Sequence, residues 1–292
     1  ERIIMELDFC FCYSIDILKT FYYLFSSLIT STLGTLIGAG GSALLGPLLL
    51  LTETSLGAKN IIGTTLACVV VNSVSGSYRY LKIGTVDIKS GAIFSLIGIP
   101  FSVFAALTLI IIDTSNFKVI FGITLILITI FMFVQSRKSG SQLQSDGFKK
   151  LNNSFFNEQR SLKTKDGEEH NYSFSMGIAA LYNVFLGFVA TFFGIGGGII
   201  RTPLLIYISG FPVKVATATS VFSLLFTSLA GTIMYWVKGY YALDLFLPAA
   251  VGAIIGAQIG ALLSKIISGM WILRILAIML FIMGIALIIE NI

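Results

Sequence analysis

Long apolar stretches alternate with short polar turns along most of the chain, and many of these stretches approach twenty residues. A helix of about 20 apolar residues crosses a bilayer core of about 30 Å. Strands of a membrane barrel would instead give runs of about ten residues with alternating polarity, and the chain shows none. The pattern therefore predicts an all-α polytopic membrane protein with about eight hydrophobic segments. They are expected at about 20–38, 61–78, 90–112, 117–136, 174–193, 214–237, 243–266 and 270–290, with shorter pieces at 43–52 and 199–209.

Two glycine-rich breaks interrupt this pattern at corresponding places. The first reads GAGGSALLGPLLL from Gly38 to Leu50, and the second reads GIGGGIIRTPLLI from Gly194 to Ile206. Because glycine costs helix stability, such runs are expected to unwind the first helix that each interrupts. Unwound backbone inside a membrane is tolerated only where protein or a watery cavity satisfies its polar groups. The matched pair therefore indicates a transporter's binding site, whereas the alternative is that the glycines only allow close helix packing.

The two breaks belong to two homologous halves. Lys59 aligns with Lys214, and Gly76 aligns with Gly231. If each break folds as a re-entrant hairpin, each half crosses an odd number of times and the halves are inverted; if the first run simply spans, they are parallel. The basic loop at 79–89 favours inverted repeats slightly, and both topologies remain open. The expected domains are an N-terminal flank at 1–19, a first membrane repeat at 20–136, a polar basic linker at 137–172 and a second membrane repeat at 173–292.

The charged residues are few and concentrated outside the apolar segments. Only 11% of the residues are charged, against about 25% in a soluble domain. Basic residues at helix flanks account for the net charge of +5 without a nucleic-acid partner. The linker has little apolar material for a core, so it is expected to be solvated, and its seven basic residues place it on the cytoplasmic side. The flank at 1–19 lacks the features of a signal peptide.

The predicted membrane segments lack the residue combinations that enzyme active sites require. The single histidine, His170, lies in the linker, and Asp87, Asp113 and Asp244 lie at helix ends. This leaves no Ser–His pair and no histidine-based metal site within the bilayer. The breaks are rich in glycine but contain no phosphate-loop GK[ST]. The sequence therefore predicts no catalytic residue, no metal and no cofactor.

Anion binding fits the breaks better. A half-helix that starts just after a break, near Ser42 or Gly198, directs bare N–H groups and a positive dipole end into the break. Arg201 follows the second break and is either an anion partner or a side chain that snorkels to the interface. Hydroxyls near the starts of the next helices either donate to the anion or bond their own backbone. The candidate substrate-binding residues are Gly38, Gly40, Gly41, Ser42, Thr64, Thr65, Gly194, Gly196, Gly197, Gly198, Arg201, Thr219 and Ser220.

These motifs resemble the sulfite exporter TauE/SafE family of membrane permeases, also called the toluenesulfonate uptake permease family. The resemblance rests on the duplicated glycine and Pro-Leu-Leu pattern at 38–49 and 194–205, and on Ala216–Ser220 with Gly231 after it. The first copy departs from the pattern, because Ser42 and Leu45 stand where the second copy has Gly198 and Arg201.

The resemblance covers about 24–289 and implies an integral membrane protein that carries out secondary transport of sulfur-containing anions such as sulfite, sulfonates or thiosulfate. The expected partners are a small anionic substrate and the lipid bilayer, and the oligomeric state is left open. A passive anion channel and a non-transporting membrane scaffold are the alternative functions.

Overall fold

The computed structural model describes residues 2–111, 116–138, 157–165, 167, 169–264, 266 and 269–290. The first half contains α1 (Arg2–Ile37), α2 (Ser42–Thr52), α3 (Ala58–Ile83), α4 (Ile88–Ile111) and α5 (Phe117–Lys138). The second part contains β1 (Asn157–Lys163), β2 (Glu169–Ser175), α7 (Met176–Phe192), α8 (Gly198–Tyr207), α9 (Val213–Val237), α10 (Leu243–Leu263) and α11 (Gly269–Ile289). Each expected apolar segment corresponds to one helix. The main difference is α1, which begins within the expected N-terminal flank.

Six helices of the described chain are long and apolar enough to cross a membrane. They span 17–37, 58–83, 88–111, 117–134, 213–237 and 243–263. The apolar helices at 176–192, 198–207 and 277–289 are shorter. The described residues thus contain six candidate spans, where the sequence predicted about eight hydrophobic segments.

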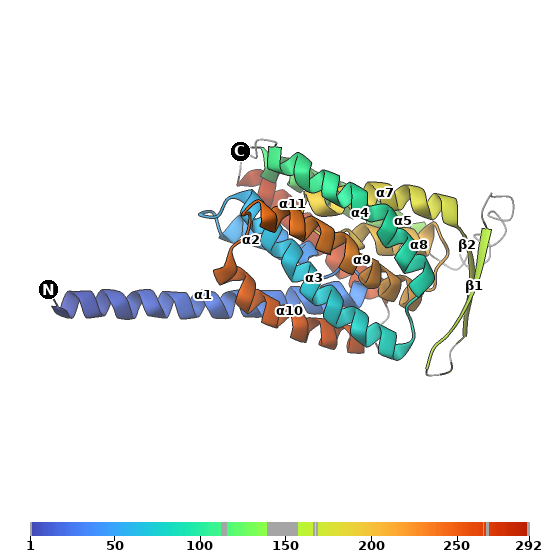
Figure 1. The fold of residues 1–292 in the computed structure, drawn as a ribbon, viewed down its shortest axis with the longest axis horizontal. Helices are drawn as coiled ribbons and strands as arrows, with labels where there is room; N and C mark the ends of the chain where they lie inside the picture. The colour runs from blue at the N-terminus through green and yellow to red at the C-terminus, as the bar shows by residue number, and fades with distance from the viewer. Residues whose placement is uncertain are drawn as a thin grey trace.

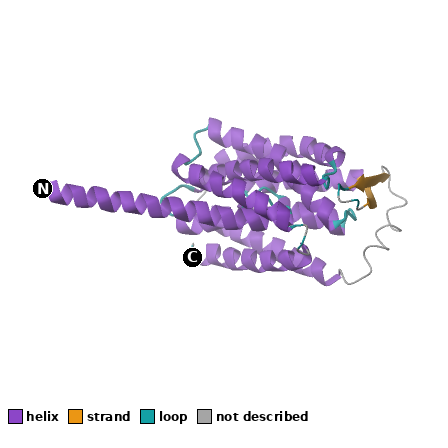
Figure 2. Cartoon of the chain, turned by 90° about the horizontal axis from the view of Figure 1, so that it is seen from below, coloured by secondary structure: helices purple, strands orange, loops and turns teal. Residues whose placement is uncertain are grey.

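The helices lie side by side in a bundle, with the β1–β2 hairpin at one end and the N-terminal part of α1 extending beyond the other (Figure 1, Figure 2). The halves exchange their packing partners, because α1 packs along α10 while α7 packs along α4. Gly252, Gly256 and Gly260 line the face of α10 that meets α1, and a Cβ on any of them would overlap a carbonyl oxygen of α1. Such small-residue spacing lets two helix backbones approach closely inside a membrane.

The central helices α3 and α9 pack against each other in opposite directions. At one end, Lys59 at the start of α3 lies 5.8 Å from the ring of Tyr240, just after α9. At the other end, the N–H of Asp87, after α3, donates to Thr219 near the start of α9 at 3.0 Å. Since α3 and α9 are equivalent helices of the two halves, their antiparallel directions bear on whether the repeats are parallel or inverted.

Each glycine break is the tip of a helical hairpin. The hydroxyl of Tyr23 in α1 donates to the Glu53 carboxylate just after α2 at 2.7 Å. Tyr182 in α7 and Ser209 just after α8 share a hydrogen bond of 2.9 Å. The short helices α2 and α8 therefore run back toward the end from which α1 and α7 entered, and the breaks lie within the bundle.

The end of the expected linker forms a β-hairpin, although most of its described side chains are exposed or half-buried. Strands β1 and β2 pair antiparallel, with Asn157 opposite Ser175 and Lys163 opposite Glu169. Tyr172 and Phe174 of β2 are buried and pack with Phe94 of α4 and Phe211. Most of the described linker side chains are thus in contact with solvent, whereas the ring of Tyr172 docks on Phe211. Residues 139–156 of the linker lie outside the described chain.

Candidate anion-binding site

The two breaks have the same backbone geometry. Gly38, Gly40 and Gly41 have φ angles of 84°, 75° and 75°, and Gly194, Gly196 and Gly197 have 68°, 69° and 71°. These positive values lie in the left-handed region that side chains other than glycine rarely adopt. The prediction that both helices unwind at their glycines is thus confirmed for the backbone.

The amides of each break divide into two groups. Those of Ala39 and Gly40 donate back to the Gly34 carbonyl at 2.6 and 3.2 Å, and those of Ile195 and Gly196 donate to Ala190 at 3.0 and 3.3 Å. These bonds close the ends of α1 and α7. The first amides of α2 and α8 have no partner within their own helices, as at every helix N-terminus. The partial positive charges at each break therefore come from the helix that follows it.

The breaks touch each other in the interior of the bundle. A Cβ on Gly198 would overlap the Gly38 carbonyl oxygen and would lie 2.6 Å from Ala39 Cα. On Gly40 a Cβ would lie 3.0 Å from Leu224 of α9 and 3.3 Å from Val69 of α3, both near the middle of their helices. The N-terminal regions of α2 and α8 are thus brought together halfway along the central helices.

Each break also rests on the central helix of the opposite half. The Gly38 carbonyl accepts hydrogen bonds from Ser220 of α9 at 2.8 Å and from Thr202 of α8 at 3.4 Å. A Cβ on Gly194 would lie 3.1 Å from the Thr65 hydroxyl oxygen of α3. Ser220 and Thr65 occupy equivalent positions in the two halves. They lie beside the breaks, and Ser220 already uses its hydroxyl to hold the first break.

Thr64 and Thr219 hold helices together. Thr64 donates to the Asn60 carbonyl at 2.7 Å and accepts from the N–H of Ala242, the N-cap of α10, at 2.9 Å. Thr219 accepts from the N–H of Asp87. The Thr64 hydroxyl thus bonds its own helix, as in the alternative to anion binding, whereas Thr219 bonds the backbone of another segment. The side chain of Ser42 lies outside the described part of the structure.

Arg201 is fully buried in the first turn of α8. Of the two alternatives for Arg201, snorkelling to the interface does not fit this burial. Its Nε donates to Asn183 Oδ1 at 3.0 Å, while Nη1 and Nη2 are buried and have no hydrogen-bond partner within the described residues. A buried guanidinium without a counter-charge is costly. Its free nitrogens are thus available for a negatively charged ligand beside the second break.

Asn183 is a neighbour of Arg201 that the sequence analysis missed. It lies in α7, is fully buried, and donates through Nδ2 to the Ala179 carbonyl at 2.7 Å. That bond turns Oδ1 toward the guanidinium. A polar residue inside the apolar run 174–193 was the available signal, but only the hairpin of α7 and α8 shows that it lies next to Arg201.

The breaks are enclosed in this structure. Gly38, Gly40 and Gly41 and all of 194–198 are buried. A groove of about 770 Å³ beside α1 is lined by Phe21, Phe25 and other mainly apolar side chains; its lining includes Leu48 of α2 but none of the glycines of the breaks. The geometry therefore corresponds to a closed arrangement around the contact between the two breaks.

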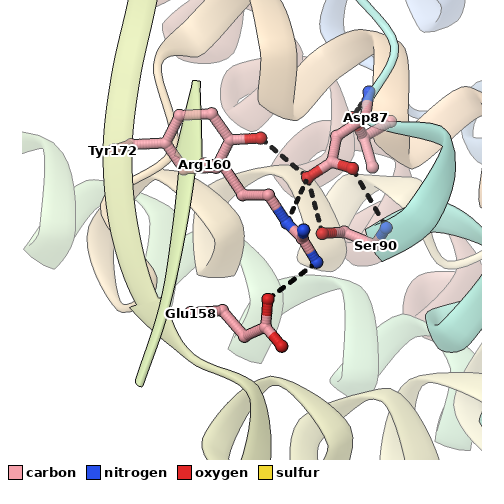
Figure 3. Close-up of polar contacts among 6 residues, drawn as sticks. Asp87, Ser90, Glu158, Arg160 and Tyr172 are labelled. Carbon is pink, nitrogen blue, oxygen red and sulfur yellow. Dashed lines mark hydrogen bonds and ion pairs between the residues drawn. The ribbon is translucent and has the colours of Figure 1, made fainter. Parts of the chain in front are cut away.

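Asp87 lies at a helix end, as expected, directly before α4, and it is buried beneath the β-hairpin. Its Oδ1 accepts from the Ser90 N–H at 3.1 Å, as a helix N-cap. Its Oδ2 accepts from the Tyr172 hydroxyl at 2.8 Å and lies 3.8 Å from Arg160 Nε (Figure 3). Arg160 also pairs with Glu158 at 2.9 Å. Burial, and next the Asp87 charge, raise the pKa of Tyr172 above its usual value. The carboxylate thus joins the hairpin to α4.

The sequence matches two probable membrane transporter proteins over most of its length. The chain is 30% identical over 273 residues to the probable membrane transporter protein YunE of Bacillus subtilis, covering 91% of this chain and 96% of that protein. It is 31% identical over 212 residues to a probable membrane transporter protein of Methanocaldococcus jannaschii, covering 71% and 68%. No solved structure matches at a significant level. The model of the family described as Sulfite exporter TauE/SafE matches residues 23–287. The chain therefore belongs to the sulfite exporter TauE/SafE family.

Proposed function

We propose that this membrane transporter is a secondary permease for small sulfur-containing anions such as sulfite, sulfonates or thiosulfate. The anion binds where the two breaks meet, close to the starts of α2 and α8. The observation that carries the proposal is the buried guanidinium of Arg201, whose Nη1 and Nη2 lack partners among the described residues. The helix N-termini add partial positive charge without adding a second fixed ion.

The binding residues are proposed to come from both halves. The first break would contribute Gly38, Gly40, Gly41 and Ser42 to the site, and the second break would contribute Gly194 and 196–198. Thr65 and Ser220 lie beside the breaks and would line the site once the bundle opens. Thr64 and Thr219 hold the adjoining helices, so their part would be to position the site.

The halves are proposed to be inverted repeats. Two observations support this arrangement: α3 and α9 are antiparallel, and each break is the tip of a re-entrant hairpin. Rocking of one repeat against the other would then expose the contact between the breaks to either side in turn. The basic linker at 137–172 would lie on the cytoplasmic side. Cysteine labelling of the exposed residues Lys165 and Lys238 from each side would test this topology.

Flux into proteoliposomes tests the function. Purified protein should move labelled sulfite, thiosulfate or a sulfonate, and Arg201→Gln should abolish this flux because the buried positive charge is lost. Accumulation of the anion against its gradient would distinguish a transporter from a passive channel. Transport of a cation with no response to any sulfur anion would refute the proposal, and no ligand-dependent stabilisation at all would favour a scaffold.

A further inference from the structure

Arg201 carries a buried positive charge that is not balanced by the described chain. Asp87 and Arg201 are the two charged residues that are buried among the described side chains. Asp87 lies at the hairpin end, where Tyr172, Ser90 and Arg160 hold its carboxylate. The described ion pairs do not include Arg201. A ligand at Arg201 therefore meets a site whose fixed charge is a single positive one.

The first break adds no second charge. By the offset that aligns the halves, Leu45 stands where the second half has Arg201, and Ser27 stands where it has Asn183. Both are buried, and the Ser27 hydroxyl donates to the Ala249 carbonyl at 2.6 Å. The contact between the breaks thus joins one charged and one neutral half.

Asn183 determines which edge of the guanidinium is free. Its Oδ1 accepts a hydrogen bond from Arg201 Nε at 3.0 Å, so the two terminal nitrogens of the guanidinium remain as a pair of parallel donors. Such a fork matches two oxygens of one planar or tetrahedral head group, as in a carboxylate or sulfonate. A single spherical ion can meet only part of that donor set. Asn183 is therefore a positioning residue for the proposed site.

We propose that the site selects singly charged anions with two or more oxygens on one head group, and rejects doubly charged anions of similar shape. The inference rests on the proposed function and narrows its substrate class. A monoanion neutralises Arg201, whereas the second charge of a dianion meets only the partial charges of the two helix N-termini and no fixed counter-ion in a low-dielectric interior. Sulfonates and hydrogen sulfite fit this charge, while thiosulfate and sulfate do not.

A matched ligand series tests the charge preference in detergent-solubilised protein. The probes are methanesulfonate, sulfate, chloride and the neutral methanesulfonamide, at constant ionic strength and near-neutral pH. Methanesulfonate should raise the melting temperature saturably, because a ligand that binds only the folded state stabilises it. Sulfate should bind at least about tenfold more weakly, chloride weakly, and methanesulfonamide should give no shift.

Asn183→Asp tests whether Arg201 holds the anion. The new carboxylate would occupy Nε and supply an internal counter-ion, so the unliganded protein should melt at a higher temperature and lose its response to methanesulfonate. Asn72→Asp is the matched control, because Asn72 is buried in α3 and bonds Thr35. It should lower the melting temperature and keep the methanesulfonate shift. A retained shift in Asn183→Asp would overturn the proposal.

Lysine at position 201 separates charge from geometry. Arg201→Lys keeps one positive charge but lacks the fork, so it should bind methanesulfonate more weakly while still preferring it over sulfate. If sulfate stabilises the wild type as strongly as methanesulfonate, the charge selection is wrong and the anion permease stands. If neither anion changes the melting temperature or crosses the membrane, the proposed function itself is wrong.

Discussion

The two glycine breaks share one backbone and differ in their side chains. Three glycines at matching positions take positive φ in each, and each break ends its helix through the same pattern of amide bonds. Only the second break, however, carries a buried cation, because Leu45 replaces Arg201 in the first. The comparison indicates that the duplicated backbone is a scaffold, whereas the chemistry of the proposed site is concentrated in one copy.

The largest effect is expected where the two breaks touch. Gly198→Ala should cost about 3 kcal/mol of stability, because its Cβ would overlap the backbone of Gly38 and Ala39. The matched control is Gly46→Ala in α2, where a Cβ would find its nearest neighbour, the Thr65 hydroxyl, at 3.9 Å. That change should be neutral or stabilising by about 0.5–1 kcal/mol. Chemical denaturation of both variants in one detergent measures the difference, and equal destabilisation would contradict the close contact of the breaks.

The two ends of the central helix pair differ as clearly as the breaks do. At one end Asp87 follows α3 and is covered by the β-hairpin, whereas Ala242 holds the equivalent place after α9. Asp87→Asn should weaken the docking of the hairpin by about 2 kcal/mol, because charge-assisted hydrogen bonds are lost. The control Asp244→Asn changes an exposed carboxylate in the first turn of α10. Amide exchange in β1 and β2 should rise only in the first variant. Equal exchange in both variants would show that Asp87 does not hold the hairpin on the helices.

Alkaline pH should act on the hairpin end. Burial raises the pKa of Tyr172, so its phenol keeps its proton in the docked state more firmly than in the undocked state. Docking is then at full strength below the ordinary tyrosine pKa of about 10 and weakens above it by at most about 1.4 kcal/mol per pH unit. Amide exchange of β2, corrected for intrinsic rates, should increase above that pH. In Tyr172→Phe this additional increase should be absent, and an identical pH profile in both proteins would exclude the Tyr172 phenol as its cause.

The sequence predicts the helices and breaks well because both follow from local chemistry. Apolar run length sets the spans, and consecutive glycines unwind a helix wherever it lies. The hairpin was missed because Tyr172 is an isolated aromatic residue in a polar segment and Phe174 was assigned to the following apolar run. Docking on Phe94 and Phe211 buries both. The burial of Asp87 depends on that hairpin, which lies far along the chain. The burial of Arg201 likewise depends on how α8 folds back along α7, which no local sequence pattern predicts.

The smallest effect is expected at a pair of equivalent tyrosines that join the central helices to the helices before the breaks. Tyr80 of α3 donates to the Thr35 carbonyl at 2.9 Å, whereas Tyr235 of α9 donates to the Thr191 carbonyl at 3.5 Å. Tyr80→Phe should therefore cost about 1 kcal/mol, since it leaves a buried carbonyl without this donor. Tyr235→Phe should cost less, because a hydrogen bond of that length is weak. Urea denaturation of both single variants measures the difference. Equal losses would mean that the two halves hold their breaks with equal strength, and the asymmetry would then be confined to Arg201 and the hairpin.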